Sequence, residues 1–304
     1  MSNPDNGHRA LWEKGLRGDF RSIAKCISLI ESGHPDHEAL LRSLPQTNRH
    51  RIIGVTGPPG AGKSTLVDGL IGELTEGGRR VAVLCVDPSS PFNFGALLGD
   101  RVRMNRWYNH PDVYIRSLAT RGSLGGLNPY ILEIAGFLEA CPFDHIVVET
   151  VGVGQSEVDI AGLADVTVVV LVPEAGDEIQ TMKAGLMEIA DVFVVNKADR
   201  PDAQLFIRNL RHRLSSSHDA RDDIPVVATV ASEGEGIPEL AGVIRRLLDE
   251  KPRKEARLHL LAERAFHLIQ KKRMKNLQKD ELRRLIARSL EDGDFNLYEF
   301  VEKM

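Results

Sequence analysis

RIIGVTGPPGAGKST, residues 51–65, joins an apolar run to a glycine-rich loop that ends in Gly-Lys-Ser-Thr. The loop fits the G-x-x-x-x-G-K-[ST] pattern of a phosphate loop, which requires a strand before it and a helix after it. Glycines let several backbone N–H groups point at one phosphate, and the positive end of the next helix adds to the attraction. The nine residues that we predict to form this nucleotide site are Gly57, Pro58, Pro59, Gly60, Ala61, Gly62, Lys63, Ser64 and Thr65.

Two side chains of this loop carry the chemistry that we expect. Lys63 is placed to reach the outer phosphates as a catalytic cation, and the Ser64 hydroxyl is placed to ligate Mg²⁺. The alternative is a glycine-rich turn that holds a lysine by chance. Three more nucleotide-site motifs follow in the order that such a site requires, so we favour the phosphate loop.

The base is predicted to be guanine. Asn196-Lys197-Ala198-Asp199 is an N-K-x-D box at the end of an apolar run. Guanine presents two adjacent donors that the Asp199 carboxylate accepts, whereas adenine would leave the carboxylate with an unmet hydrogen bond, at a cost of roughly 1–3 kcal/mol. We expect Asn196 to tie this box to the phosphate loop and the Lys197 stem to cover the base. A solvated strand-to-helix turn is the alternative. The segment predicted to offer N–H groups to the guanine oxygen is Thr229-Val230-Ala231.

Acidic residues at strand ends indicate the metal site. Glu149 ends the apolar run 145–149 at the Walker-B position, which commonly holds Mg²⁺ through water. Gly152 lies three residues on, where a backbone N–H can contact the γ-phosphate of GTP and make the segment a switch. Asp87 and Asp100 are assigned to the metal or to the attacking water. Gln155 does not directly follow Gly152, so we expect slow intrinsic hydrolysis that a partner stimulates.

The hydrophobic pattern predicts an α/β fold, a P-loop domain with a mainly parallel sheet covered by helices on both faces. Most candidate strands are apolar throughout, which is typical of parallel strands buried on both sides. Their ranges are 51–56, 81–86, 113–117, 145–149, 166–172, 191–196 and 225–230, and helices are expected at 63–76, 129–140, 179–190, 203–214 and 237–249. Asn128 is predicted to cap the helix that begins at Pro129.

The two ends of the chain are predicted to be helical, unlike the middle, where strands and helices alternate. We predict an N-terminal helical segment over 1–48, the nucleotide domain over 49–250 and a C-terminal helical arm over 251–304. Residues 251–290 hold 13 Lys/Arg against 4 Asp/Glu, with an apolar stripe that includes Leu258, Ala262, Ala265 and Ile269. That stripe packs either on its own domain or in an oligomer interface, and the basic excess is read as a solvated face.

Composition narrows the class of protein. The 304 residues are 42% hydrophobic and 27% charged with a net charge of −4, which gives no reason to propose nucleic acid as a partner. Three cysteines without paired spacing fit buried thiols in a reducing compartment. With no membrane-length apolar run and no leader signal, we expect a cytoplasmic protein that does not contact the membrane.

Longer motifs resemble one family. They are GPPGAGKST (57–65), VDPSSPFNFGALLGDRVRM (86–104), IRSLATRGSLGGL (115–127), VETVGVGQSEVDIA (148–161), LVPEAGDEIQTMKAGLMEIADVFVVNKAD (171–199) and GEGIPEL (234–240). Together they resemble the MeaB/ArgK/MMAA group of SIMIBI-type P-loop GTPases from about Ile52 to Leu240. Val230 departs from this group, in which serine is more usual at that position.

The resemblance implies a GTP-hydrolysing chaperone that binds GTP or GDP with Mg²⁺. Its partner would be an adenosylcobalamin-dependent acyl-CoA mutase, chiefly methylmalonyl-CoA mutase, whose cofactor delivery it gates and which it protects or reactivates. It also implies a homodimer held by the C-terminal arm and a further switch at 173–185, with Asp177, Gln180 and Lys183 in contact with the partner.

Three other functions fit less well. A kinase or ATPase of basic amino-acid transport would need an acceptor site that is not visible here. A nickel-inserting GTPase would need a histidine-rich tract or paired ligands, but the ten histidines are scattered. A scaffold with a dead nucleotide site is disfavoured by the intact Lys63, Ser64, Glu149 and Asp199.

Overall fold

The computed structural model describes residues 5–45, 51–87, 104–120, 127–152, 159–175, 184–216, 224–250 and 254–304, the last range without 275, 276, 278, 292, 294 and 303. The chain divides into two compact units, Met1–Lys251 and Pro252–Met304. The first holds the sheet and every motif described above. The second is helical.

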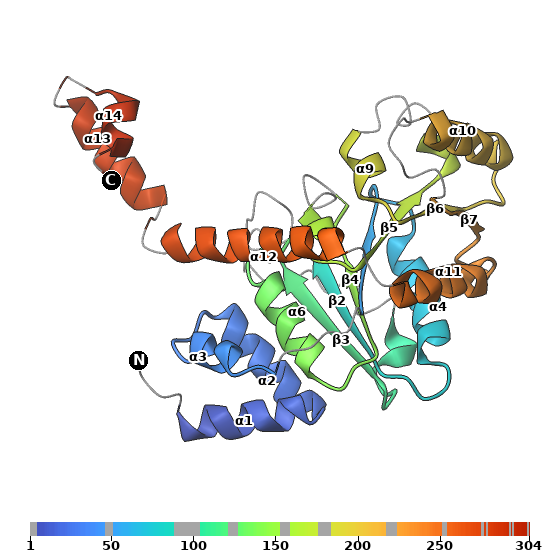
Figure 1. Cartoon of the computed structure of the whole chain (residues 1–304), viewed down its shortest axis with the longest axis horizontal. Coiled ribbons are helices and arrows are strands. Elements are labelled where there is room, and N and C mark those ends of the chain that lie inside the picture. Colours follow the sequence, from blue (N-terminus) through green and yellow to red (C-terminus); the bar gives the residue numbers. More distant parts are fainter. Residues whose placement is uncertain are drawn as a thin grey trace. The chain divides into compact units, whose positions relative to one another are not determined.

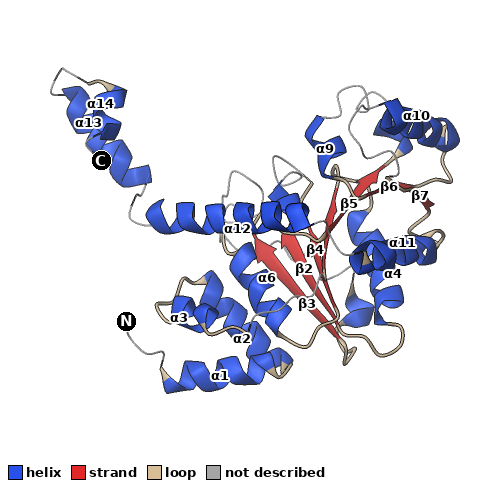
Figure 2. Cartoon of the chain, in the orientation of Figure 1, coloured by secondary structure: helices blue, strands red, loops and turns tan. Residues whose placement is uncertain are grey.

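The first unit is built on a seven-stranded parallel sheet (Figure 2). In space the strand order is β3-β2-β4-β1-β5-β6-β7. The strands are β1 (Ile52–Thr56), β2 (Val81–Asp87), β3 (Val113–Ala119), β4 (His145–Glu149), β5 (Val166–Leu171), β6 (Val192–Asn196) and β7 (Val226–Thr229). All seven predicted strands are confirmed, within two residues at each end. Because the strands are parallel, their carboxyl ends meet at one edge, where ligands bind in sheets of this kind.

Helices cover both faces of the sheet (Figure 1). On one face α1 (Asn6–Leu16), α2 (Phe20–Glu31), α3 (His37–Arg42) and α6 (Ile131–Ala140) share a core with β1–β4. On the other face α4 (Lys63–Thr75) packs beside α11 (Ile237–Asp249). The helix α10 (Ala203–Ser216) covers β5 and β6. The hydrophobic side chains of both sheet faces are therefore removed from water, as the apolar strand patterns predict.

Short elements complete the unit. The 3₁₀ turns are η1 (Asn105–Trp107), η2 (Ile160–Gly162) and η3 (Pro173–Ala175), and the helix α9 (Ala184–Ile189) precedes β6. The predicted helix at 179–190 is confirmed from Ala184, and residues 179–183 lie outside the described part of the chain. The three cysteines, Cys26, Cys85 and Cys141, are buried and free, as predicted. Burial raises the pKa of both Cys26 and Cys141 to about 12.

The predicted cap of α6 is wrong. The helix begins at Ile131 with Tyr130 at the N-cap position. Asn128 instead accepts the Tyr130 N–H at 2.9 Å in a turn before the helix. Its amide donates to the Ala119 carbonyl oxygen at 2.8 Å. Asparagine side chains bond to nearby backbone groups both in turns and at helix N-caps, so the residue type alone did not distinguish the two.

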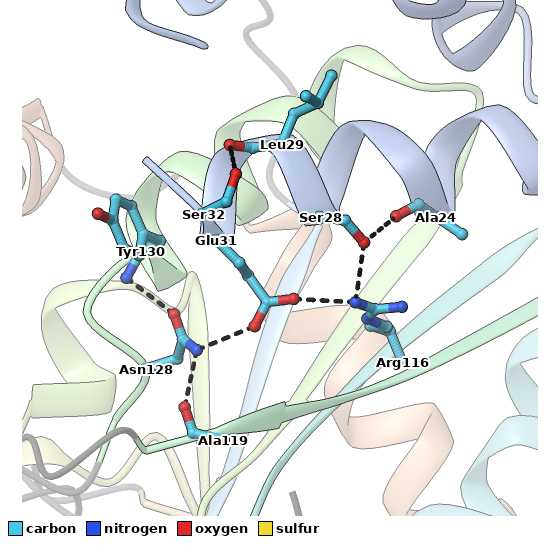
Figure 3. Close-up of polar contacts among 9 residues, drawn as sticks. All are labelled: Ala24, Ser28, Leu29, Glu31, Ser32, Arg116, Ala119, Asn128 and Tyr130. Carbon is cyan, nitrogen blue, oxygen red and sulfur yellow. Dashed lines mark hydrogen bonds and ion pairs between the residues drawn. The ribbon is translucent and has the colours of Figure 1, made fainter. Parts of the chain in front are cut away.

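A buried polar network joins the N-terminal helices to the sheet (Figure 3). Glu31, at the end of α2, pairs with Arg116 of β3 at 2.9 Å and accepts from the Asn128 amide at 3.4 Å. The same Arg116 donates to the Ser28 hydroxyl at 3.2 Å. The Glu31 side chain is only 9% exposed and that of Arg116 is 24% exposed. The network therefore couples helix, strand end and turn in a partly desolvated environment.

Glu31→Ala is expected to destabilise the first unit strongly. It removes the carboxylate that Arg116 and Asn128 share, and breaking a buried ion pair costs about 3–5 kcal/mol. Because the Arg116 side chain reaches solvent, water offsets part of this cost, and we expect the free energy of unfolding to fall by about 2–3 kcal/mol. Urea denaturation measures it. Glu38→Ala, which removes an exposed partner of Arg42, is the matched control. Equal losses in the two variants would contradict the role assigned to the network.

The second unit contains α12 (Lys254–Met274), α13 (Lys279–Glu291) and α14 (Leu297–Glu302). Large apolar side chains of α12 are exposed, among them Leu258, Leu261, Phe266, Leu268, Ile269 and Met274. Among the described residues, no helix is both long enough and apolar enough to cross a membrane.

Candidate nucleotide-binding site

The predicted phosphate loop lies between β1 and α4 and is preformed by its own contacts. Gly62 is the N-cap of α4 with φ 86°, and a Cβ there would lie 2.4 Å from the Asn196 side-chain nitrogen. Only glycine fits that backbone conformation without displacing Asn196. The Lys63 ammonium donates to the Gly57 carbonyl oxygen at 2.8 Å and to that of Pro58 at 3.0 Å. These two bonds hold the Lys63 ammonium against the backbone of the loop, and the Lys63 side chain is buried.

One acidic side chain, Glu149, contacts the loop, and a second, Asp87, lies on the neighbouring strand. The Ser64 hydroxyl donates to Glu149 Oε1 at 2.6 Å. Glu149 ends β4 and is paired in register with Cys85 of β2, so Asp87 lies two residues further along the adjacent strand. Both carboxylates are buried, with residue exposures of 4% for Glu149 and 6% for Asp87. Oxygen donors of this kind, a hydroxyl and two carboxylates, fit the preference of Mg²⁺.

Gly152, three residues after Glu149, packs closely against the phosphate loop. Its φ is 81°, and a Cβ there would lie 2.2 Å from the Gly57 carbonyl oxygen and 2.4 Å from Lys63 Nζ. The backbone at 152 therefore lies against Gly57 and Lys63, the part of the loop that is predicted to hold the outer phosphates. One residue pair was not predicted: the hydroxyls of Thr56 and Thr150 are hydrogen-bonded at 2.9 Å. The available signal was a threonine at the carboxyl end of each of two adjacent strands, Thr56 as the last residue of β1 and Thr150 directly after β4.

The N-K-x-D box is bonded to the phosphate loop, as predicted. Asn196 donates to the Ala61 carbonyl oxygen at 2.8 Å. Its Oδ1 accepts from the Thr229 hydroxyl and from the Ala231 N–H, both at 3.1 Å. Lys197, at φ 58°, donates to the Gly60 carbonyl oxygen at 2.9 Å, a contact that sequence reasoning missed. The phosphate loop, the N-K-x-D box and residues 229–231 are thus bonded to one another.

Asp199 lies at the tip of this box and is exposed. The next residue, Arg200, forms an ion pair with Glu174 of η3. This pair connects the box after β6 with the segment after β5. The exposed Asp199 carboxylate is therefore accessible to a ligand, and the ion pair of Arg200 with Glu174 helps to hold the adjacent backbone in place.

The predicted third element of the base site is engaged within the protein. The Val230 N–H donates to the Glu235 carbonyl oxygen at 3.1 Å, and the Ala231 N–H is bonded to Asn196. Contact with the guanine oxygen therefore requires Val230 or Ala231 to exchange its present acceptor, and it stays a prediction. Five predicted site residues lie outside the described part of the chain: Asp100, Gln155, Asp177, Gln180 and Lys183.

The fold and these motifs define a P-loop GTPase. A phosphate loop follows β1, an acidic residue ends β4, and a guanine box follows β6 of one parallel sheet. Together they indicate guanine nucleotide binding. Comparison with known proteins agrees with this class and narrows it.

Residues 23–286 match the family model of the methylmalonyl-CoA mutase-associated GTPase MeaB. A relative named as a GTPase in Pyrococcus horikoshii is 49% identical over 235 residues, which are 76% of this chain and 74% of the relative. The mitochondrial methylmalonic aciduria type A homolog of Caenorhabditis elegans is 37% identical over 64% of this chain and 53% of its own. The chain therefore belongs to the MeaB family of GTPases, and it hydrolyses GTP.

One solved structure agrees over the whole chain. A LAO/AO transport system kinase superposes with a TM-score of 0.68 at 25% identity, covering 99% of this chain and 98% of the other. The predictions of family, fold class and GTPase activity are thus confirmed.

Proposed function

We propose that the protein is a GTP-driven chaperone of an adenosylcobalamin-dependent acyl-CoA mutase, with methylmalonyl-CoA mutase as the favoured client. In this role it gates delivery of the cofactor and protects or reactivates the enzyme. The observation that carries the proposal is the family match over residues 23–286, because the family description names that mutase. The name of the nematode relative supports the same client. We place the protein with its client in the cytoplasm.

Each site residue has a separate role in GTP binding or hydrolysis. Lys63 stabilises charge on the β- and γ-phosphates, and the N–H groups of residues 57–65 cradle them. Mg²⁺, held by Ser64 and by the Glu149 and Asp87 carboxylates, would neutralise phosphate charge. Asp199 selects guanine. Asn196 holds the guanine box in a fixed position relative to the phosphate loop through its bond to the Ala61 carbonyl oxygen. Asp100 is assigned to the metal or to the attacking water.

The γ-phosphate is the signal that we expect the client to detect. Gly152 already touches Gly57 and the Lys63 ammonium, so a third phosphate between them changes the position of the segment after Glu149. Glu174 is the second residue of the predicted second switch at 173–185, and it pairs with Arg200, which follows the guanine box. Gln155, Asp177, Gln180 and Lys183 are proposed to transmit this change to the mutase, and slow intrinsic turnover gives the client time to respond.

Complex formation tests the client. The protein is mixed with purified methylmalonyl-CoA mutase, and gel filtration is run in GDP and in a non-hydrolysable GTP analogue. We expect co-elution whose extent differs between the two nucleotides. Unrelated acyl-CoA enzymes of similar size serve as controls. Absence of a complex with both nucleotides, and with the isobutyryl- and ethylmalonyl-CoA mutases in the same assay, would contradict the proposal.

The C-terminal unit is proposed to form a homodimer. The exposed stripe Leu258, Ala262, Ala265 and Ile269 lies on α12, and apolar surface of this extent usually marks an interface. Truncation after Glu250 is expected to leave a folded monomer that binds GTP, since all nucleotide motifs lie upstream. Light scattering measures the mass of each form. A dimeric truncated protein would place the interface elsewhere.

A transport-system kinase is the second candidate, because the superposed structure carries that title. A kinase transfers the γ-phosphate to a protein acceptor, whereas a GTPase transfers it to water. Incubation with γ-labelled GTP distinguishes them. We expect all label as free phosphate and none on protein, and label on a transport protein would favour the kinase.

A further inference from the structure

The fold brings together two histidines and an aspartate that lie far apart in the sequence. His8 is in the first turn of α1, while His34 and Asp36 flank Pro35 in the turn between α2 and α3. One ligand atom from each of the three lies within 4.8 Å of the other two. The cluster belongs to the N-terminal helices, away from the phosphate loop and the guanine box.

Both rings direct a nitrogen at one carboxylate oxygen. His8 Nδ1 is 2.8 Å from Asp36 Oδ2, and His34 Nδ1 is 3.9 Å from the same atom. The rings of His8 and His34 meet edge to face, with centroids 4.6 Å apart. A simple hydrogen bond between His8 and Asp36 explains the first distance. The second nitrogen, His34 Nδ1, is too distant for a hydrogen bond to that oxygen and accepts the Asp36 backbone N–H at 3.3 Å instead.

These separations suit a tetrahedral ion. With zinc–ligand distances of about 2.0–2.2 Å, two ligand atoms of a tetrahedral site lie about 3.4 Å apart. The observed values of 2.8 and 3.9 Å fall on either side of that distance. Rotations of the His8 and His34 side chains would therefore place an ion between the three atoms, and the ion would replace the proton of the His8–Asp36 hydrogen bond.

The protonation states also fit a metal. His34 Nδ1 accepts the Asp36 N–H at 3.3 Å, so it is the unprotonated ring nitrogen that a metal requires, and an ion would replace this N–H as its partner. Asp36 Oδ2 also accepts the Asp5 N–H at 3.2 Å, so the His8 ring and the Asp5 backbone both meet the carboxylate oxygen that would bind the ion. His37 Nδ1 is hydrogen-bonded to the His34 carbonyl oxygen and holds the turn.

We propose that His8, His34 and Asp36 bind one zinc ion that ties α1 to the turn between α2 and α3. Imidazole and carboxylate ligands suit zinc, whereas Mg²⁺ and Ca²⁺ prefer oxygen alone. Side-chain exposures of 28%, 38% and 13% for the three residues let the ion enter from solvent and leave the fourth position to water. The ion closes a loop of chain, because His8 and Asp36 are 28 residues apart. The inference does not depend on the identity of the client.

Calorimetric titration with zinc tests the site. The protein is the full chain without a histidine tag, saturated with GDP and Mg²⁺ so that the nucleotide site does not compete. We expect one zinc ion per chain in the wild type. In His34→Ala affinity should fall by at least about 100-fold, since even outer-shell partners of a metal are worth about 10–100-fold. The matched control is His212→Ala, which removes an exposed histidine of α10 and should bind as the wild type does.

Two further measurements separate a metal site from a structural hydrogen bond. Cobalt should give the intense visible absorption of a tetrahedral site in the wild type but not in His8→Gln, which keeps a donor to Asp36 and loses a ligand. Zinc should raise the Tm of the wild type and not that of His34→Ala, while GTP hydrolysis is the same in both. Zinc affinity equal in wild type and His34→Ala, or no zinc binding by the wild type at micromolar concentration, would overturn the proposal.

Discussion

Lys63→Ala is expected to reduce GTP hydrolysis by about 10²–10³-fold, because one preorganised donor at developing charge is commonly worth that much. The substitution removes the ammonium and also its bonds to the Gly57 and Pro58 carbonyl oxygens. The loop should therefore loosen as well as lose its charge. Phosphate release at saturating GTP measures the effect.

Lys25→Ala is the control, since Lys25 is an exposed lysine of α2. It should hydrolyse GTP at the wild-type rate. Circular dichroism and the midpoint of thermal unfolding establish that the Lys63 variant is folded. A folded Lys63→Ala protein with wild-type turnover would show that the reaction occurs without the phosphate-loop lysine.

Asp199→Asn is expected to change which nucleotide binds. The carboxylate accepts two hydrogen bonds from guanine, and bonds to a charged group are worth about 1.5–3 kcal/mol each. Their loss corresponds to roughly 10²–10⁴-fold in affinity for GTP. Xanthine nucleotides carry a carbonyl where guanine has its amine, so the new amide should bind them better than the wild type does.

Thermal-shift titration with GTP, ATP and XTP measures this change in nucleotide preference. Asp202→Asn is a matched control, because Asp202 is an exposed aspartate three residues beyond the box. It should keep the preference of the wild type. Equal stabilisation of the wild type by ATP and GTP at matched concentrations would contradict the assignment of the base.

The sheet and the phosphate site could be predicted because their residues carry local constraints. Apolar strands have few other ways to be buried, and the glycines of the loop meet conformations and close contacts that side chains exclude, as at Gly62. The N-K-x-D box likewise predicted the bond between Asn196 and the loop.

Contacts between distant segments could not be predicted in the same way. Nothing in the sequence around Glu31 indicates that it pairs with Arg116, which follows 85 residues later. The same holds for His8 and Asp36. Asn128 shows a different limit, because its side chain suits both a helix cap and the turn that it forms. Pairings of this kind depend on which elements pack together, and local spacing does not encode that.

The rate of GTP hydrolysis with and without methylmalonyl-CoA mutase tests the proposed function most directly. Phosphate release is followed at fixed Mg²⁺ and GTP, with the Lys63→Ala protein plus mutase as the blank for contaminating phosphatase. We predict slow turnover by the protein alone and a rise of at least about tenfold on adding the mutase, a modest effect beside those of activators that complete a GTPase site. A rate that does not change with any acyl-CoA mutase would contradict a client-gated GTPase.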